Sequence, residues 1–103
     1  MIRVSALYPN GPDAKFNMEY YANNHARLMR DRVGSAMISA EYNIGLGSGV
    51  PGEPAPYIAV GHAVFNSLEE FQAAFGPHAE ELMADVPNFT NVEPVLQISE
   101  IVE

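Results

Sequence analysis

The sequence predicts an α+β domain whose elements follow the order βαββαβ, and three observations lead to this prediction. Four stretches of the 103-residue chain alternate in polarity or are continuously apolar, as strands are. Two stretches repeat apolar side chains every three or four residues, as helices do. Turn-forming residues separate these predicted strands and helices. Residues 1–103 are also the usual size of a single domain. This order forms a ferredoxin-like, four-stranded antiparallel sheet with both helices on one face.

The first half of the chain supplies one strand and one helix. Residues 2–8 alternate and end at the turn-forming segment Pro9–Pro12. Asn17 is a typical N-cap, and apolar residues then recur at helical spacing from Met18 to Val33. Gly34 is typical of the position that follows a helix. We therefore predict a strand over residues 2–8 and a helix over residues 18–33.

The second half repeats the pattern with an extra strand. Residues 45–56 hold four glycines and three prolines, which predicts a loop. Ser67 and Glu70 have the spacing of a capping box at the start of the second helix, and Gly76-Pro77 predicts a break in it. The remaining strands are predicted over residues 36–44, 57–65 and 92–102.

The third strand has two apolar faces, although a sheet with one solvated face should alternate apolar with polar residues. One face would carry Tyr57, Ala59, Gly61, Ala63 and Phe65, and the other Ile58, Val60, His62 and Val64. The helices can cover only one of these faces. A second copy of the chain is the simplest cover for the other, so we predict a homodimer in which two sheets form a dimeric α/β barrel.

Composition excludes several classes of function. The net charge is −8, from thirteen acidic against five basic residues, which argues against nucleic acids and anionic membranes as partners. The absence of cysteine removes disulfides and thiolate metal sites. No apolar run is long enough for a signal peptide or a membrane span. We expect a cytoplasmic protein that binds neither nucleic acid nor membrane.

His25 is the candidate catalytic residue. It lies four residues after Tyr21 and three before Leu28, so it shares the face of the first helix that packs on the sheet. A partly buried imidazole without a carboxylate partner would be neutral and able to accept a proton. The alternative is a structural histidine whose ring is satisfied by a carbonyl or a tyrosine.

The other two histidines are weaker candidates. His62 is predicted on the dimer face, and His78 follows Gly76-Pro77 at a solvated helix start. The three histidines stand on separate elements, so no metal site is expected. The glycines of residues 45–49 are followed by prolines rather than by a helix, which argues against a nucleotide loop. We predict that the protein needs no cofactor.

Tyrosines supply the candidate substrate-binding residues. Tyr8 ends the first strand, and Tyr21 lies on the buried side of the first helix. Such tyrosines commonly pack with the hydroxyl reaching water. A pocket rimmed by their hydroxyls would also suit a small hydrophobic or aromatic ligand, and we predict that Tyr8 and Tyr21 line such a pocket beside His25.

Three segments together resemble the EthD family, the ethyl tert-butyl ether degradation proteins. The opening segment has a tyrosine-proline strand end, a phenylalanine, two aromatic residues and a histidine. The three segments are Leu7–His25, Tyr57–Ser67 and Ala84–Thr90. The chain departs from the family pattern at Ala26-Arg27, where a small residue and a proline are common, which changes the local wall of any pocket.

The resemblance implies membership of the dimeric α/β-barrel superfamily. That superfamily includes cofactor-free monooxygenases, polyketide cyclases, muconolactone isomerases and haem-binding proteins, so it implies a homodimer with a pocket in each subunit but no single reaction. Cyclase-type relatives carry a histidine on the pocket face of the third strand. This sequence has Ala59 and Gly61 there, which argues against cyclase chemistry.

Three functions remain open at this point. The first is a small cofactor-independent catabolic or biosynthetic enzyme, a lyase, isomerase or oxygenase, that acts on an aromatic or cyclic hydrophobic metabolite. The second is a non-catalytic accessory or ligand-binding protein of a degradation pathway of the ethyl tert-butyl ether type. The third is a structural dimerisation module. A defined pocket lined by His25 would favour the enzyme, whereas a filled interior would favour an accessory protein.

Overall fold

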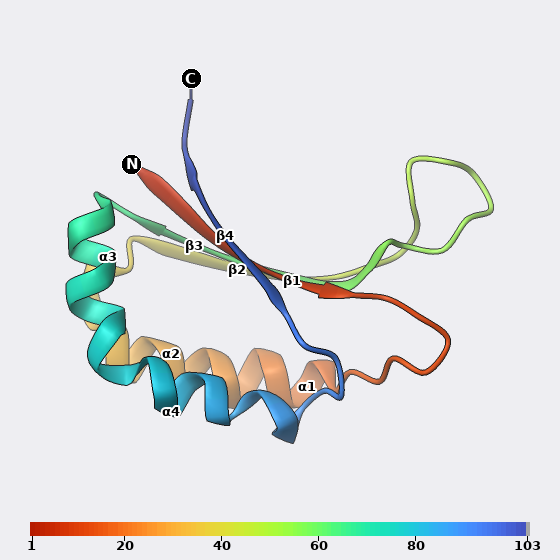
Figure 1. Ribbon diagram of the computed structural model, residues 1–103, viewed down its shortest axis with the longest axis horizontal. Coiled ribbons are helices and arrows are strands. Elements are labelled where there is room, and N and C mark those ends of the chain that lie inside the picture. The colour runs from red at the N-terminus through yellow and green to blue at the C-terminus, as the bar shows by residue number, and fades with distance from the viewer. Residues whose placement is uncertain (103) are drawn as a thin grey trace.

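The computed structural model describes residues 1–102 and contains a four-stranded antiparallel sheet with the strand order β2-β3-β1-β4. All helices lie on one face of this sheet, and both chain ends project from the same end of it (Figure 1). The predicted ferredoxin-like α+β architecture is therefore confirmed. The strands are β1 (Ile2–Pro9), β2 (Ser39–Ile44), β3 (Tyr57–Phe65) and β4 (Val95–Glu100).

The helical layer consists of short segments joined end to end. The first half of the chain supplies α1 (Met18–Tyr20), a π-helical turn (Tyr21–His25), α2 (Ala26–Val33) and a 3₁₀ turn (Gly34–Ala36). The second half supplies α3 (Leu68–Phe75), a 3₁₀ turn (Gly76–His78), α4 (Ala79–Ala84) and a 3₁₀ turn (Val86–Asn88). Among residues 1–102, no helix is both long enough and apolar enough to cross a bilayer.

The predicted caps and breaks are present. The Asn17 side chain accepts a hydrogen bond from the Tyr20 amide at 3.0 Å, and the Ser67 hydroxyl accepts one from the Glu70 amide at 3.1 Å. Gly34 has φ +71°, a value that a residue with a Cβ rarely adopts, and α2 ends there. The second helix breaks at Gly76-Pro77 as predicted.

Three element boundaries differ from the prediction. The first helix is not α-helical throughout, because the Ala26 amide bonds to the Tyr21 carbonyl and forms the π turn. β2 begins at Ser39 rather than residue 36, because residues 34–36 form a 3₁₀ turn first. β4 spans Val95–Glu100 rather than residues 92–102, and it begins only after Pro94 because proline has no amide hydrogen to give to a neighbouring strand.

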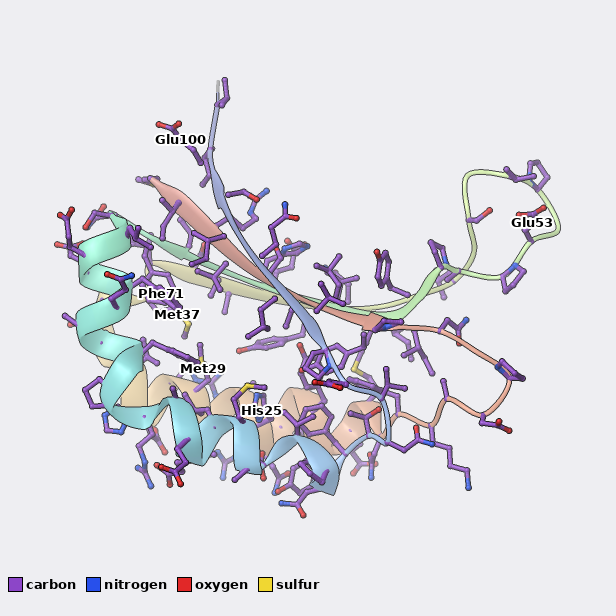
Figure 2. The ribbon with its side chains drawn as sticks, in the orientation of Figure 1. His25, Met29, Met37, Glu53, Phe71 and Glu100 are labelled. Carbon is purple, nitrogen blue, oxygen red and sulfur yellow. The ribbon has the colours of Figure 1, made fainter. Side chains whose placement is uncertain are left out.

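Two groups of buried residues form the interior between the sheet and the helices. One is aromatic and contains Tyr8, Tyr21 and Phe89, and the other contains Phe65, Phe71 and Leu82. Figure 2 labels Met29 and Phe71, from different helices, on the helical side of the sheet. It also shows Glu53 on the 45–56 loop, which extends away from both layers.

No other part of residues 1–102 covers the sheet face opposite the helices (Figure 1). Along β3, residues 59, 61, 63 and 65 are buried, and residues 58, 60, 62 and 64 are half-buried. The two faces therefore separate as predicted. His62 lies on the uncovered face, where its Nδ1 is 2.7 Å from the Ser5 hydroxyl. Val60 lies beside Leu7 on β1, which in turn pairs with Val95 on β4, so an apolar row crosses this face.

Candidate functional site

A cavity of about 290 Å³ lies between the sheet and the helical layer. Its wall includes residues of both buried groups and is almost entirely hydrocarbon. The polar residues of its wall are Tyr8, Tyr21, Tyr42, His25 and His62. Met83 of α4 and Leu96 and Ile98 of the edge strand β4 also line the cavity and are 40–52% exposed, so they lie at its mouth. The three predicted site residues, His25, Tyr8 and Tyr21, thus share one cavity.

The π turn positions the two helical members of this group. Tyr21 and His25 are its first and last residues, and the wider turn leaves both rings on the sheet-facing side. The rings stack, with centroids 5.7 Å apart and an interplanar angle of 17°. Phe89 closes the other side of His25 at a centroid distance of 4.9 Å. Such turns are frequent at functional sites, and here the turn fixes the imidazole at the cavity wall.

His25 has a carboxylate partner, so the expectation that it lacks one is wrong. Its Nδ1 lies 2.9 Å from Oδ2 of Asp85, and the two side chains are only 13% and 11% exposed. Asp85 ends α4, 60 residues further along the chain, and folding brings it beside the π turn. Because an ionised carboxylate only accepts, Nδ1 carries the shared hydrogen, which makes Nε2 the nitrogen that is available to a ligand.

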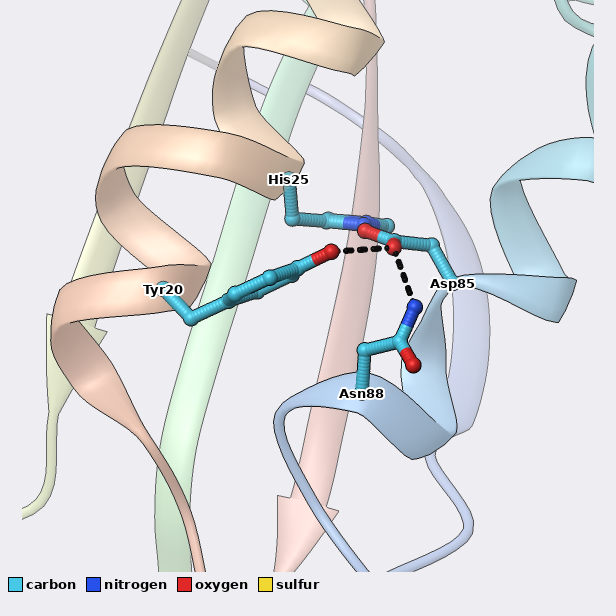
Figure 3. A network of polar contacts seen from close by, with 4 residues as sticks. All are labelled: Tyr20, His25, Asp85 and Asn88. Atoms are coloured by element: carbon cyan, nitrogen blue, oxygen red, sulfur yellow. Dashed lines mark hydrogen bonds and ion pairs between the residues drawn. The ribbon is translucent and has the colours of Figure 1, made fainter.

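Asp85 is held by two further donors (Figure 3). The Tyr20 hydroxyl donates to its Oδ1 at 2.7 Å, and the Asn88 amide donates to the same oxygen at 2.9 Å. Burial alone would raise the pKa of the Asp85 carboxyl, but the hydrogen bonds from Asn88, Tyr20 and His25 outweigh it and lower the pKa. Asp85 is therefore an anion at neutral pH whose orientation is fixed from three sides.

Asp85→Ala is expected to destabilise the fold by about 1–3 kcal/mol at pH 7, because it leaves partly buried donors without an acceptor. Since folding lowers the pKa of Asp85, its contribution is complete well above the ordinary value of 3.8 and is lost as the pH falls toward the folded-state pKa. Urea unfolding from pH 7 to pH 3 should show the two proteins converging in acid. Asp31→Ala, at an exposed position of α2, is the control. A constant difference across this range would contradict the prediction.

Tyr21 is the centre of the aromatic group. Its ring meets those of Tyr8 and Tyr42 edge to face, at centroid distances of 5.6 and 5.2 Å. The Tyr21 hydroxyl lies over Gly61 on β3, where a Cβ would overlap it. Burial raises the pKa of Tyr8 to about 12, and burial also raises the pKa values of Tyr21 and Tyr42. All three hydroxyls are therefore protonated at neutral pH.

The donor set does not fit a metal ion or a haem. Within residues 1–102, no group of three or more His, Asp or Glu side chains is close enough to hold a metal. His25 and His62 are the wall residues that could ligate a haem iron, but the wall contains no lysine or arginine to pair with haem propionates.

Sequence reasoning missed the residues that complete the site. Asp85 and Asn88 fall in the segment Ala84–Thr90, which resembles the EthD pattern, but nothing in the sequence pairs Asp85 with His25. Tyr20 looks like one of several packing tyrosines until its contact with Asp85 is seen. Tyr42 joins the site only through strand register, because it lies opposite Gly61.

Comparison with known proteins agrees with the predicted resemblance. The model of the EthD domain matches residues 11–93. The chain belongs to the EthD family. The residues by which the sequence resembles the family also pack together in the structure. The ring of Tyr8 contacts those of Phe16, Tyr21 and Phe89, with ring centroids 5.1–5.8 Å apart. The family motif therefore describes the aromatic wall that surrounds His25.

Solved structures of other family members have the same fold. An EthD-like protein of Ralstonia eutropha JMP134 is 35% identical, with a TM-score of 0.93 over 99% of this chain and 92% of that one. An EthD family protein of Bacillus halodurans C-125 is 19% identical, with a TM-score of 0.70 over 99% of each chain.

A more distant structure also shares the architecture. A dimeric protein of unknown function and ferredoxin-like fold from Bacteroides fragilis NCTC 9343 is 11% identical, with a TM-score of 0.56 over 97% of this chain and 95% of that one. No curated protein matches the sequence. These likenesses establish family and fold, so the reaction has to be argued from the site.

Proposed function

We propose that this EthD protein is a small cofactor-independent enzyme, of the isomerase or lyase type, that moves a proton on a cyclic or aromatic hydrophobic metabolite. The observation that supports this most is the 2.9 Å contact between His25 Nδ1 and Asp85 in the wall of an apolar cavity. A histidine oriented by a carboxylate is a common general base. A carrier protein would need the cavity but would have no use for an oriented proton acceptor.

The arrangement supports one chemical step in particular. Asp85 holds the hydrogen on Nδ1 and stabilises the imidazolium that forms when Nε2 takes a proton. The proton would come from a carbon next to a carbonyl, so a C–H bond breaks, an N–H bond forms, and the electron pair moves onto the carbonyl oxygen as an enolate. Return of the proton to another carbon completes an isomerisation. The step balances without an oxidant or a reductant.

Deuterium exchange tests this proposal without knowledge of the natural substrate. The wild-type protein should speed exchange of the acidic C–H of 2-tetralone, a two-ring ketone, in D₂O, as followed by NMR. His25→Ala should lower that rate by about 10²-fold, the lower end of the usual contribution of a general base. His78→Ala is the matched control, because His78 stands outside the cavity wall.

The outcome separates the two main functions. Exchange that depends on His25 supports the enzyme. If 2-tetralone binds but exchanges equally fast in His25→Ala and the wild type, the catalytic role is wrong and the protein is a ligand-binding accessory. Melting temperatures of both variants must be measured alongside, because a structural histidine would lower stability rather than rate.

We also propose that the protein works as a homodimer through the uncovered sheet face. Support comes from the apolar row of Val60, Leu7 and Val95 on that face, and the Bacteroides fragilis relative is described as dimeric. A stable pair would bury about 1,600 Å² in total. The cavity lies on the opposite side of the sheet, so pairing leaves its mouth free.

A further inference from the structure

The tyrosine side of the cavity holds a feature that proton transfer alone does not require. Tyr8, Tyr21 and Tyr42 come from β1, the π turn and β2, and all three line the cavity together with Gly61. Gly61 allows the Tyr21 hydroxyl to reach the sheet surface, because any side chain there would overlap it. The rings of Tyr8 and Tyr21 meet edge to face, with their centroids 5.6 Å apart. Donor groups from three separate elements thus converge on one side of an otherwise hydrocarbon wall.

These donors suit an oxygen atom that gains negative charge. Tyrosine hydroxyls in an apolar cavity donate strongly, because little water competes for them. His25 shares the wall and stacks on Tyr21, so a ligand can reach the imidazole and the hydroxyls together. An enolate forms when His25 removes a proton beside a carbonyl, and its oxygen needs donors of this kind.

Charge around the cavity limits what the ligand can be. The wall contains no lysine or arginine among the described residues, and the Asp85 carboxylate lies directly behind His25. A ligand carboxylate or phosphate would lose its hydration there without gaining a cation. The volume of about 290 Å³ is near the lower limit of about 300 Å³ for small-molecule pockets. The site therefore favours small, neutral ring systems.

We infer that Tyr8, Tyr21 and Tyr42 form a carbonyl-binding site and that the substrate is a small, neutral cyclic ketone or phenol. This rests on the proposed function, since the carbonyl is the group that makes the neighbouring C–H acidic. One oxygen accepts from the tyrosine hydroxyls while the carbon beside it faces His25. The ligand's hydrocarbon remainder points toward the exposed apolar residues of the mouth, Met83, Leu96 and Ile98.

Three ligands of the same ring size test this inference: naphthalene, 2-naphthol and 2-naphthoate. Fluorescence titration should show 2-naphthol binding about fivefold to tenfold more tightly than naphthalene, the contribution of one good hydrogen bond. The anion 2-naphthoate should bind more weakly than either. Tyr21→Phe and Tyr42→Phe should each reduce the preference for 2-naphthol over naphthalene while leaving naphthalene binding intact.

Two controls make the result specific. Tyr57→Phe, at a 36% exposed position outside the wall, should keep the preference. His25→Ala should also keep it, because the tyrosines and not the imidazole hold the oxygen. Equal binding of naphthalene and 2-naphthol, tight binding of 2-naphthoate, or a preference that is lost only in His25→Ala would overturn the inference.

Failure of this inference is distinguishable from failure of the proposed function. Suppose that the tyrosine variants keep the preference for 2-naphthol over naphthalene while exchange of 2-tetralone still depends on His25. The role of His25 as general base is then supported, and the proposed carbonyl-binding site is wrong. If the preference for 2-naphthol is reduced in the tyrosine variants but the exchange rate is the same in His25→Ala and the wild type, the cavity binds neutral ring compounds without acting on them. Tyr42→Phe keeps the test usable if the more deeply buried Tyr21→Phe fails to fold.

Discussion

Gly61→Ala is expected to lower the melting temperature by roughly 5–20 °C and to abolish 2-naphthol binding. The added Cβ would overlap the Tyr21 hydroxyl and lie 3.4 Å from Tyr21 Cζ. Tyr21 is 2% exposed and packed against Tyr8, Phe16 and Phe89, so its ring can move off Gly61 only by disrupting these contacts and entering the cavity where the ligand would bind. Overpacking of this kind costs about 1–3 kcal/mol, and each kcal/mol shifts the melting temperature of a domain this size by about 4–8 °C.

A double variant tests the cause of this loss. Tyr21→Phe removes the oxygen that the new methyl group would meet, so it should recover much of the stability in the Gly61→Ala background, although it cannot restore the preference for 2-naphthol over naphthalene. Gly49→Ala is the control, because a Cβ at that loop position meets nothing within 4 Å. If Gly61→Ala melts like the wild type, Tyr21 is not confined by the sheet and its proposed role in binding has no structural basis.

Val60→Asp is expected to convert the proposed homodimer into a monomer, raising the dissociation constant by about 10⁴-fold or more. In a two-fold symmetric pair the substitution puts an unpaired carboxylate into the apolar row twice, and each buried charge without a partner costs several kcal/mol. Sedimentation velocity at micromolar concentration should show wild-type dimers and variant monomers.

The control for this experiment lies on the other side of the molecule. Ala73→Asp adds the same charge at an exposed position of α3, in the helical layer, and should leave the dimer intact. Because the cavity opens on the helical side, monomeric Val60→Asp should still bind 2-naphthol if it remains folded. A monomeric wild type, or a dimer that only Ala73→Asp disrupts, would show that the uncovered sheet face is not the interface.

These two predictions assign ligand binding to the helix-covered face of the sheet and dimer formation to the uncovered face. Gly61 and Ala63 of β3 line the cavity from the helix-facing side, whereas Val60 lies in the apolar row of the uncovered face. Neighbouring residues of one strand therefore carry separate tasks, and Gly61→Ala and Val60→Asp should affect ligand binding and assembly independently.

Local patterns in the sequence were sufficient to predict the helices and strands and the order in which they follow one another. The caps at Asn17 and Ser67 and the helix end at Gly34 depend on residues within one turn of each other, and all three are present in the structure. The alternation along β3 separated its two faces because side chains of a strand point to opposite sides in turn. Helical spacing and the position of Tyr8 at a strand end predicted that His25, Tyr8 and Tyr21 lie together, and the three residues line one cavity.

Only the tertiary structure decided how the site is built. Asp85 reaches His25 across 60 residues of sequence, and no spacing rule connects a residue at the end of α4 with one in the π turn. Tyr42 meets Tyr21 because the register of β2 on β3 sets it opposite Gly61. The sequence determined which residues are buried on each element, because burial follows local periodicity. Their chemical partners depend on how the elements pack, and this is why an oriented His25–Asp85 pair stands where an unpartnered histidine was expected.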